Sequence, residues 1–97
     1  MPMRAAHILV EGLVQGVGFR AWVMQEAIGS GLTGWVRNRR TGAVEAVIAG
    51  DVQVVGAMLE QCRRGPQHAR VDALYLIADV TDGSLGSFGD FEVRPTA

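Results

Sequence analysis

Residues 11–20 read Glu-Gly-Leu-Val-Gln-Gly-Val-Gly-Phe-Arg and join an apolar run, residues 5–10, to a helix-forming segment, residues 21–28. This pattern predicts a strand, a turn that contains three glycines, and a helix. The first N–H groups of a helix have no partner inside it, and the helix dipole places partial positive charge there. Glycines let successive N–H groups point into one hollow, and Arg20 at the rim adds a planar, charged fork. We therefore expect a cradle for a phosphate or a carboxylate.

The turn alone leaves a second interpretation open, a tight strand–helix connection with an arginine on the surface. It lacks the Gly-Lys-Ser/Thr ending of a Walker loop, and it does not match the pattern Gly-x-Gly-x-x-Gly. These two nucleotide-binding motifs are therefore excluded at this turn.

Alternating apolar positions and turn residues predict the other elements. The expected strands span residues 4–10, 32–38, 43–49, 69–80 and 91–94, and the expected helices span residues 20–28 and 52–64. Gly50 should end the strand before it, and Asp51 should cap the second helix. With right-handed crossovers, the order β-α-β-β-α-β predicts an α+β fold, the ferredoxin-like sandwich. It has an antiparallel sheet with both helices on one face, plus a short C-terminal strand.

The composition is that of one globular domain spanning residues 1–97. Hydrophobic residues make up 48% and charged residues 20% of the chain, which argues against disorder. The net charge of −1 argues against nucleic acid as a partner, because general binders carry a basic surplus. The lone Cys62 cannot form a disulfide within the chain, which fits a reducing, cytoplasmic location. His7 and Glu11 interrupt the N-terminal apolar stretch, so we expect no signal peptide and no membrane segment.

A second candidate site lies at residues 34–38, Gly-Trp-Val-Arg-Asn, which lead into a hairpin turn at residues 39–42. In the predicted sheet this strand lies beside the one at 43–49, which is itself next to the first strand, so Asn38 should approach the glycine-rich turn. The Asn38 side chain offers both a donor and an acceptor. It can hold a water by its oxygen, but it cannot act as a base at neutral pH. The alternative is that Asn38 only begins the turn, as asparagine often does.

Together these motifs resemble those of the acylphosphatase family. The likeness rests on residues 12–20 and 34–38, followed by Gly42, and residues 63–66 and 89–94 also resemble the family. It therefore spans nearly the whole chain. The resemblance implies a ferredoxin-like fold and hydrolysis of a carboxyl–phosphate anhydride, with no metal and no cofactor.

The resemblance also implies a role for each site residue. It implies that Asn38 positions the attacking water and that the substrate is a small acyl phosphate. Inorganic phosphate is then both the product and a competitive inhibitor, and a monomer is expected. The resemblance implies that six consecutive residues bind the phosphate: Gln15, Gly16, Val17, Gly18, Phe19 and Arg20. Arg20 would bind through its side chain, and the others through their backbone N–H groups.

The sequence departs from the family pattern at three positions. Leu13 stands where the family often has a basic residue, so one helper for the anion is missing. Ser30 stands where leucine is usual, which weakens the end of the first helix. Thr41 occupies a turn position that often holds Asp or another small polar residue. These departures bear on efficiency and stability more than on identity.

Other side chains that could carry chemistry have simpler interpretations. Cys62 falls on the apolar stripe of the second helix and is expected to pack in the core. His7 is expected on the solvated face of its strand, and His68 lies in a turn. Trp35 and Phe19 are interpreted as core walls near the site and not as a stacking platform.

Two other functions compete with hydrolysis. The same scaffold could be a non-catalytic module that binds an anion or a partner, but loss of Arg20 or Asn38 would have indicated such a module, and both are present. RNA-binding sheets of this topology need aromatic residues on their central strands, and residues 4–10 and 43–49 contain none. The pair Arg39-Arg40 either steers an anionic substrate or forms a solvated turn, and the second interpretation is favoured.

Overall fold

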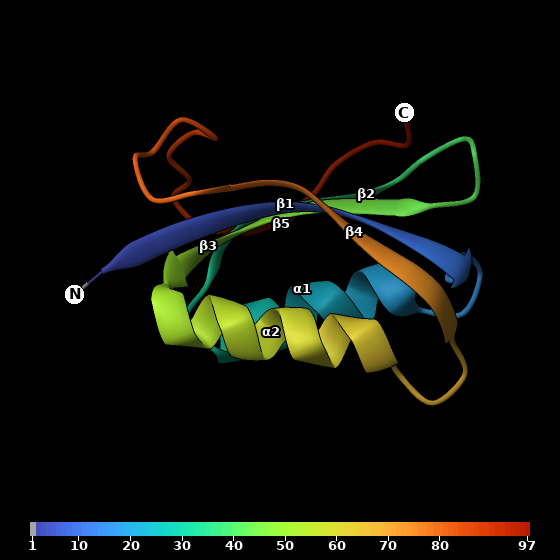
Figure 1. The fold of residues 1–97 in the computed structure, drawn as a ribbon. Coiled ribbons are helices and arrows are strands. Elements are labelled where there is room, and N and C mark those ends of the chain that lie inside the picture. Colours follow the sequence, from blue (N-terminus) through green and yellow to red (C-terminus); the bar gives the residue numbers. More distant parts are fainter. Residues whose placement is uncertain (1) are drawn as a thin grey trace.

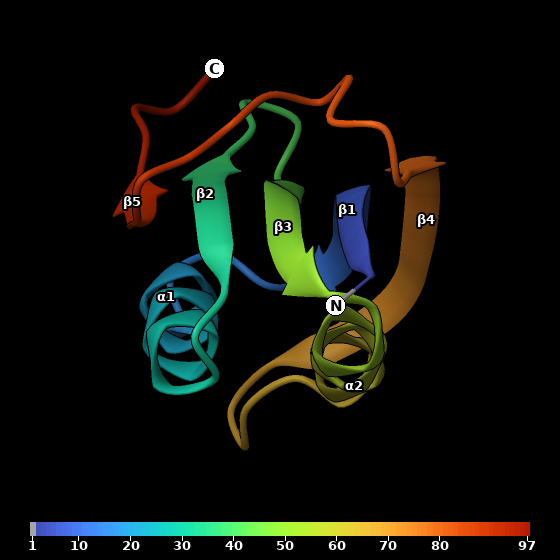
Figure 2. The same ribbon diagram turned by 90° about the vertical axis from the view of Figure 1, so that its left-hand side faces the viewer.

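The computed structural model describes residues 2–97, which form two helices and one five-stranded sheet (Figure 1). The elements in chain order are β1 (Met3–Leu13), α1 (Phe19–Gly29), β2 (Thr33–Asn38), β3 (Val44–Asp51), α2 (Val52–Arg64), β4 (Arg70–Val80) and β5 (Phe91–Val93). The strand order across the sheet is β4-β1-β3-β2-β5. Both helices cover the same face, with α1 beneath β2 and α2 beneath β1 and β3 (Figure 2). The predicted ferredoxin-like α+β sandwich is confirmed.

The C-terminal strand β5 extends the sheet at the edge beside β2. It runs parallel to β2, with Phe91 opposite Gly34, whereas the other neighbouring strands are antiparallel. Phe91 is 5% exposed and belongs to the core. This buried side chain explains how so short a strand is held, because the few ladder hydrogen bonds of a three-residue strand contribute little net stability by themselves.

The core lies between the sheet and the helices and is filled by the positions that alternation predicts. Side chains in β1 and β3 alternate between the two faces, and their even-numbered residues face the helices. The helices contribute apolar stripes at helical spacing. The buried residues of these four elements include Ala6, Ile8, Val10, Val23, Ala27, Val44, Ala46, Ile48, Val55, Met58, Leu59 and Cys62. Cys62 is fully buried in this core, which confirms the packing role predicted for it, and this burial raises the pKa of its thiol to about 12.

Helix α2 has the bounds that the sequence predicts. The Asp51 carboxylate accepts hydrogen bonds from the N–H groups of Gln53 at 3.0 Å and Val54 at 3.4 Å, which confirms it as the N-cap. The prediction that Gly50 ends the preceding strand is wrong, because β3 continues to pair with β1 through Gly50 and Asp51. In the described part of the chain, neither helix combines the length and apolar character needed to cross a membrane.

Gly12 belongs to β1 and not to the turn in which the sequence analysis places it. Its φ angle is 134°, and a Cβ there would lie 2.1 Å from the carbonyl oxygen of Arg70 in β4. Strand β1 pairs with β4 as far as Leu13, with a register shift just before Gly12. Gly12 therefore allows the close approach of two strands, and the turn itself comprises residues 14–18.

The sheet face opposite the helices carries a polar cluster around Glu45. The side chain of Glu45 is 7% exposed, and its carboxylate accepts from His7 Nε2 at 2.6 Å, Arg37 Nε at 2.7 Å and Arg39 Nη1 at 3.0 Å. Burial raises the pKa of Glu45, but these hydrogen bonds outweigh it and lower the pKa to about 2. His7 lies on the open face, as predicted, but it is half-buried and not solvated, because the neighbouring strand β3 places the buried carboxylate of Glu45 beside it.

Trp35 lies on this same open face, level with Val47 of β3. Its ring centroid is 4.9 Å from the guanidinium carbon of Arg37 and 4.8 Å from that of Arg94, so two cations cover it. Trp35 is buried as predicted, at 7% exposed, but the arginines bury it on the open face, and it is Val36 of β2 that packs in the cluster between the sheet and the helices. The interpretation as a core wall is confirmed for Phe19, which is 1% exposed in the core.

Candidate active site

Residues 14–18, which we call the cradle loop, connect β1 to the first turn of α1. Val14 is buried, whereas Gly16 and Gly18 are exposed, with φ angles of 75° and 80° that a side chain would strain. Gly18 is the N-cap of α1, no side chain caps this helix, and its first turn contains no acidic residue. Within residues 2–97, the N–H groups of residues 15–18 donate to no protein acceptor. The loop thus presents free donors at the positive end of α1.

A hollow of about 180 Å³ lies beside these donors. Arg20 comes from the start of α1 and Asn38 from the end of β2, and both line this hollow. Of the residues expected to bind phosphate, only Val17 is not part of the lining, and its side chain packs against the core. The lining residues are Val14, Gln15, Gly16, Gly18, Phe19, Arg20, Ala21 and Asn38.

The guanidinium of Arg20 is available to an incoming anion. Within residues 2–97, no carboxylate forms an ion pair with it, and its side chain is half-buried. Arg39 forms an ion pair with Glu45, so the interpretation of a solvated turn does not hold for Arg39. It agrees with Arg40, which is exposed. The arginines that pair with carboxylates are Arg4, Arg37, Arg39, Arg63, Arg70 and Arg94.

Asn38 ends β2 opposite Val44, and its backbone is held on both sides. Its carbonyl oxygen accepts from the N–H of Ala97 at 3.1 Å, and the turn after it is closed by the N–H of Gly42, which donates to Arg39 at 3.0 Å. The turn therefore does not use the Asn38 side chain. Among the described residues, the buried Oδ1 of Asn38 accepts from no donor. Such an orphaned acceptor costs about 1–3 kcal/mol, and because it is buried, a bound molecule can donate to it only after the Asn38 side chain turns towards the hollow.

The Gln15 side chain links the cradle loop to the hairpin between β2 and β3. Its Nε2 donates to the carbonyl oxygen of Arg39 at 2.7 Å and to that of Ala43 at 2.8 Å. From the sequence, only the backbone N–H of Gln15 is expected to take part in the site, and this link by its side chain is not predicted. No local pattern signals it, because the bond joins segments that only the folded sheet brings together.

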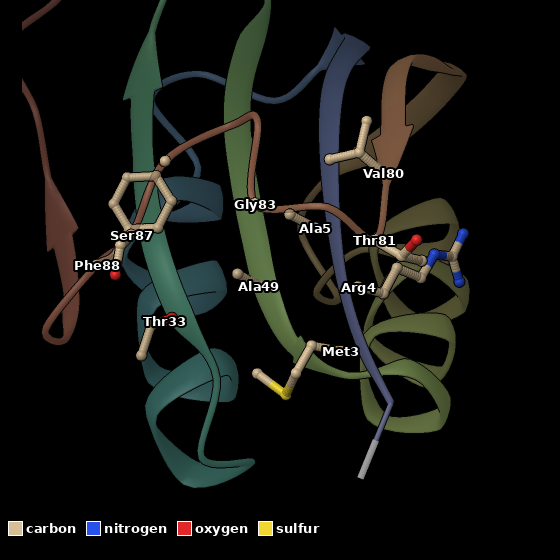
Figure 3. A pocket seen from close by; sticks show the side chains of 11 residues that line it. Met3, Arg4, Ala5, Thr33, Ala49, Val80, Thr81, Gly83, Ser87 and Phe88 are labelled. Atoms are coloured by element: carbon tan, nitrogen blue, oxygen red, sulfur yellow. The ribbon is translucent and has the colours of Figure 1, made fainter.

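A second hollow, of about 280 Å³, lies on the open face of the sheet next to the loop between β4 and β5. The side chains of Met3, Val80 and Phe88 border it (Figure 3). The charged residue that lines it, Arg4, is bound by Asp79 at 2.8 Å. Although this hollow is larger, its lining lacks the free cation and the unpaired helix donors found at the start of α1. The smaller hollow is therefore the candidate active site.

Comparison with known proteins identifies the same family along most of the chain. The acylphosphatase family model matches residues 6–93. An acylphosphatase of Nitrobacter winogradskyi is 57% identical over 89 residues, which cover 92% of this chain and 84% of that protein. An acylphosphatase of Bradyrhizobium diazoefficiens is 54% identical over 92 residues, which cover 93% of each protein.

Solved structures agree with the sequence relatives. The crystal structure of acylphosphatase from Bacillus subtilis matches with a TM-score of 0.86 at 32% identity, and covers 94% of this chain and 98% of that one. An acylphosphatase structure from Coxiella burnetii matches with a TM-score of 0.85 at 34% identity, and covers 96% and 94% of the two chains. The chain therefore belongs to the acylphosphatase family, an enzyme family named for the hydrolysis of acyl phosphates.

Proposed function

We propose that this chain hydrolyses small acyl phosphates to a carboxylate and inorganic phosphate, by attack of one positioned water on phosphorus. The observation that carries the proposal is the hollow at the start of α1. It is lined by Arg20, by a loop with free N–H donors and by Asn38, whose buried side-chain oxygen accepts from no donor among the described residues. The donors suit phosphoryl oxygens, and the acceptor suits a water molecule. Membership of the acylphosphatase family supports the same reaction.

The donor side of the hollow would bind the phosphoryl group. The N–H groups of residues 15–19 and the guanidinium of Arg20 offer several fixed donors to its oxygens, and the arginine fork fits two oxygens at once. In phosphoryl transfer, negative charge spreads over the equatorial oxygens, and fixed donors stabilise it without reorganising. The leaving carboxylate is a weak base, so it departs without a general acid.

The acceptor side would place the nucleophile. In this step the Asn38 side chain turns its Oδ1, which is buried in the empty site, towards the hollow. There it accepts a hydrogen bond from the water and so turns a lone pair of the water towards phosphorus. An amide is not a base at neutral pH, so Asn38 contributes by position. The new oxygen–phosphorus bond forms while the bond between phosphorus and the carboxylate oxygen breaks. The electron pair leaves with the carboxylate, and the water hydrogens end on the phosphate product.

We extend the proposal to a reaction without a resident metal or cofactor. The residues that line the hollow supply amide, guanidinium and apolar groups, with no carboxylate, imidazole or thiol among them. Across residues 2–97, no group of three His, Cys, Asp or Glu side chains is placed to hold a metal ion. Activity should persist after dialysis against a strong chelator. A large loss that Mg²⁺ restores would contradict this part of the proposal.

The proposal is tested by phosphate release from benzoyl phosphate. Wild-type protein should turn over, and Asn38→Ala should lower kcat by about 10² or more because the water loses its positioning partner. The inhibition constant of inorganic phosphate should stay nearly unchanged in Asn38→Ala. Arg63→Ala is the matched surface control, since Arg63 lies on α2 and, among residues 2–97, pairs with no carboxylate other than Glu60, at 3.5 Å.

Two outcomes would change the assignment. A wild-type protein that binds phosphate but releases none from benzoyl phosphate would be a non-catalytic anion-binding module. Equal damage to kcat and to phosphate affinity in Asn38→Ala would move Asn38 from positioning water to binding the anion.

A further inference from the structure

The side-chain amide of Gln15 donates two hydrogen bonds at the base of the site. Both protons of its Nε2 are used, one by the carbonyl of Arg39 and one by that of Ala43. These two carbonyls already accept from the turn's own N–H groups, those of Gly42 and Arg39 respectively. The orientation of the amide is therefore fixed by chemistry, because a reversed amide would place its oxygen against two carbonyl oxygens.

The place of this contact in the sheet explains why it matters. Val44 of β3 is paired with Val10 of β1 on one side and with Asn38 of β2 on the other. Strand β3 thus separates the strand that leads into the cradle loop from the strand that ends at Asn38. Two strand spacings, about 10 Å, lie between them, and no ladder hydrogen bond joins β1 to β2 directly.

The geometry points to Gln15 as a positioning residue for catalysis, one that sets the distance between the phosphate cradle and the water held by Asn38. Its amide ties the cradle loop to the hairpin that directly follows Asn38. Arg20 and the loop donors belong to one continuous segment, so they can bind phosphate without this tie. The in-line placement of water against phosphorus needs both segments in register. This inference rests on the proposed acyl phosphate hydrolysis.

The first test replaces Gln15 by methionine, which keeps the length of the side chain and removes both donors. We expect kcat for benzoyl phosphate to fall about tenfold or more, because displacements near 1 Å can cost about 10² in rate. The inhibition constant of inorganic phosphate should change by less than about threefold, since the cradle itself is retained. Gln15→Asn keeps the amide on a side chain that is too short to reach both carbonyls, and its kcat should lie between those of wild type and Gln15→Met.

The second test is a double-mutant cycle with Asn38→Ala. If Gln15 acts through the register with Asn38, then Gln15→Met should lower kcat by less than about threefold once Asn38 is already alanine. A merely structural role would not produce this non-additivity. Each variant is assayed below its own melting temperature, determined by circular dichroism, so that only folded protein is compared. If Gln15→Met does not fold, Gln15→Asn takes its place in the cycle.

The outcomes separate this inference from the function on which it rests. Wild-type protein without activity on benzoyl phosphate would overturn the proposed function and the positioning role together. Active wild type with a lower melting temperature but an unchanged kcat in Gln15→Met would leave the function standing and overturn the positioning role. A full tenfold loss in the Asn38→Ala background, or a loss of phosphate affinity equal to the loss of kcat, would also overturn it.

Discussion

Replacing Glu45 by glutamine should destabilise the protein near neutral pH and remove the part of its sensitivity to acid that this carboxylate contributes. Hydrogen bonds from Arg37, His7 and Arg39 lower the pKa of Glu45 from 4.5 to about 2 against the opposing effect of burial. At about 1.4 kcal/mol per pKa unit, the folded state favours the charged carboxylate by about 3 kcal/mol. The side chain is 7% exposed, so solvent screens these bonds little. A lowered pKa gives stability that is complete above about pH 5 and is lost as the pH falls towards 2.

The assay is urea unfolding of wild type and Glu45→Gln at about pH 7, 5 and 3. We expect Glu45→Gln to be less stable than wild type by about 3 kcal/mol at pH 7, and the difference to shrink as the pH approaches 2. Glu92→Gln is the matched control, because Glu92 pairs with Arg94 at 3.1 Å but its side chain is 55% exposed. That pair should contribute no more than about 1 kcal/mol. Parallel pH curves for wild type and Glu45→Gln would refute the reasoning.

Three further predictions concern Arg20, the phosphate site and the glycines of β1 and the cradle loop. Arg20→Ala should lower kcat/KM by about 10²–10³, and Arg20→Lys should recover only part of this loss, because lysine lacks the planar fork. Equal kcat/KM in Arg20→Lys and wild type would rule out bidentate binding. Inorganic phosphate at about a hundredfold excess over its Kd should stabilise wild type by about 2.7 kcal/mol and raise Tm by roughly 10–20 °C. Chloride at equal ionic strength should do far less, and an equal phosphate shift in Arg20→Ala would place the anion elsewhere. Gly12→Ala should cost at least about 3 kcal/mol in urea unfolding and Gly16→Ala about 1–2, since only the first meets a backbone oxygen; equal costs would contradict this.

Local signals in the sequence predict most of the fold and bring both site motifs to one end of the sheet. The alternation in β1 and β3 identifies the buried face, because a half-buried strand has a period of two. Asp51 before an apolar stripe marks the start of α2 to the residue, since capping depends on neighbours in the chain. Arg20 and Asn38 are found in the same way, as the ends of a glycine-rich turn and of a strand.

Features that depend on partners in neighbouring strands could not be predicted from the sequence. His7 looks solvated until β3 places Glu45 beside it, and Trp35 looks like a core residue until two arginines are seen to cover it on the open face. Gly12 looks like part of a flexible turn, but the backbone of β4 requires it. The two hydrogen bonds from the Gln15 side chain to the hairpin likewise exist only in the folded sheet, where β3 lies between β1 and β2.

Hydrolysis of benzoyl phosphate in H₂¹⁸O tests the central claim most directly, namely that water beside Asn38 attacks a phosphorus held in the cradle. In this arrangement the new bond joins the water oxygen to phosphorus, and the carboxylate leaves with the oxygens it already carried. After brief turnover by the wild-type protein, mass spectrometry should find the label in inorganic phosphate and unlabelled benzoate. Label in the benzoate would show attack on the carbonyl carbon, and would contradict the placement of the phosphoryl group between Arg20 and the water.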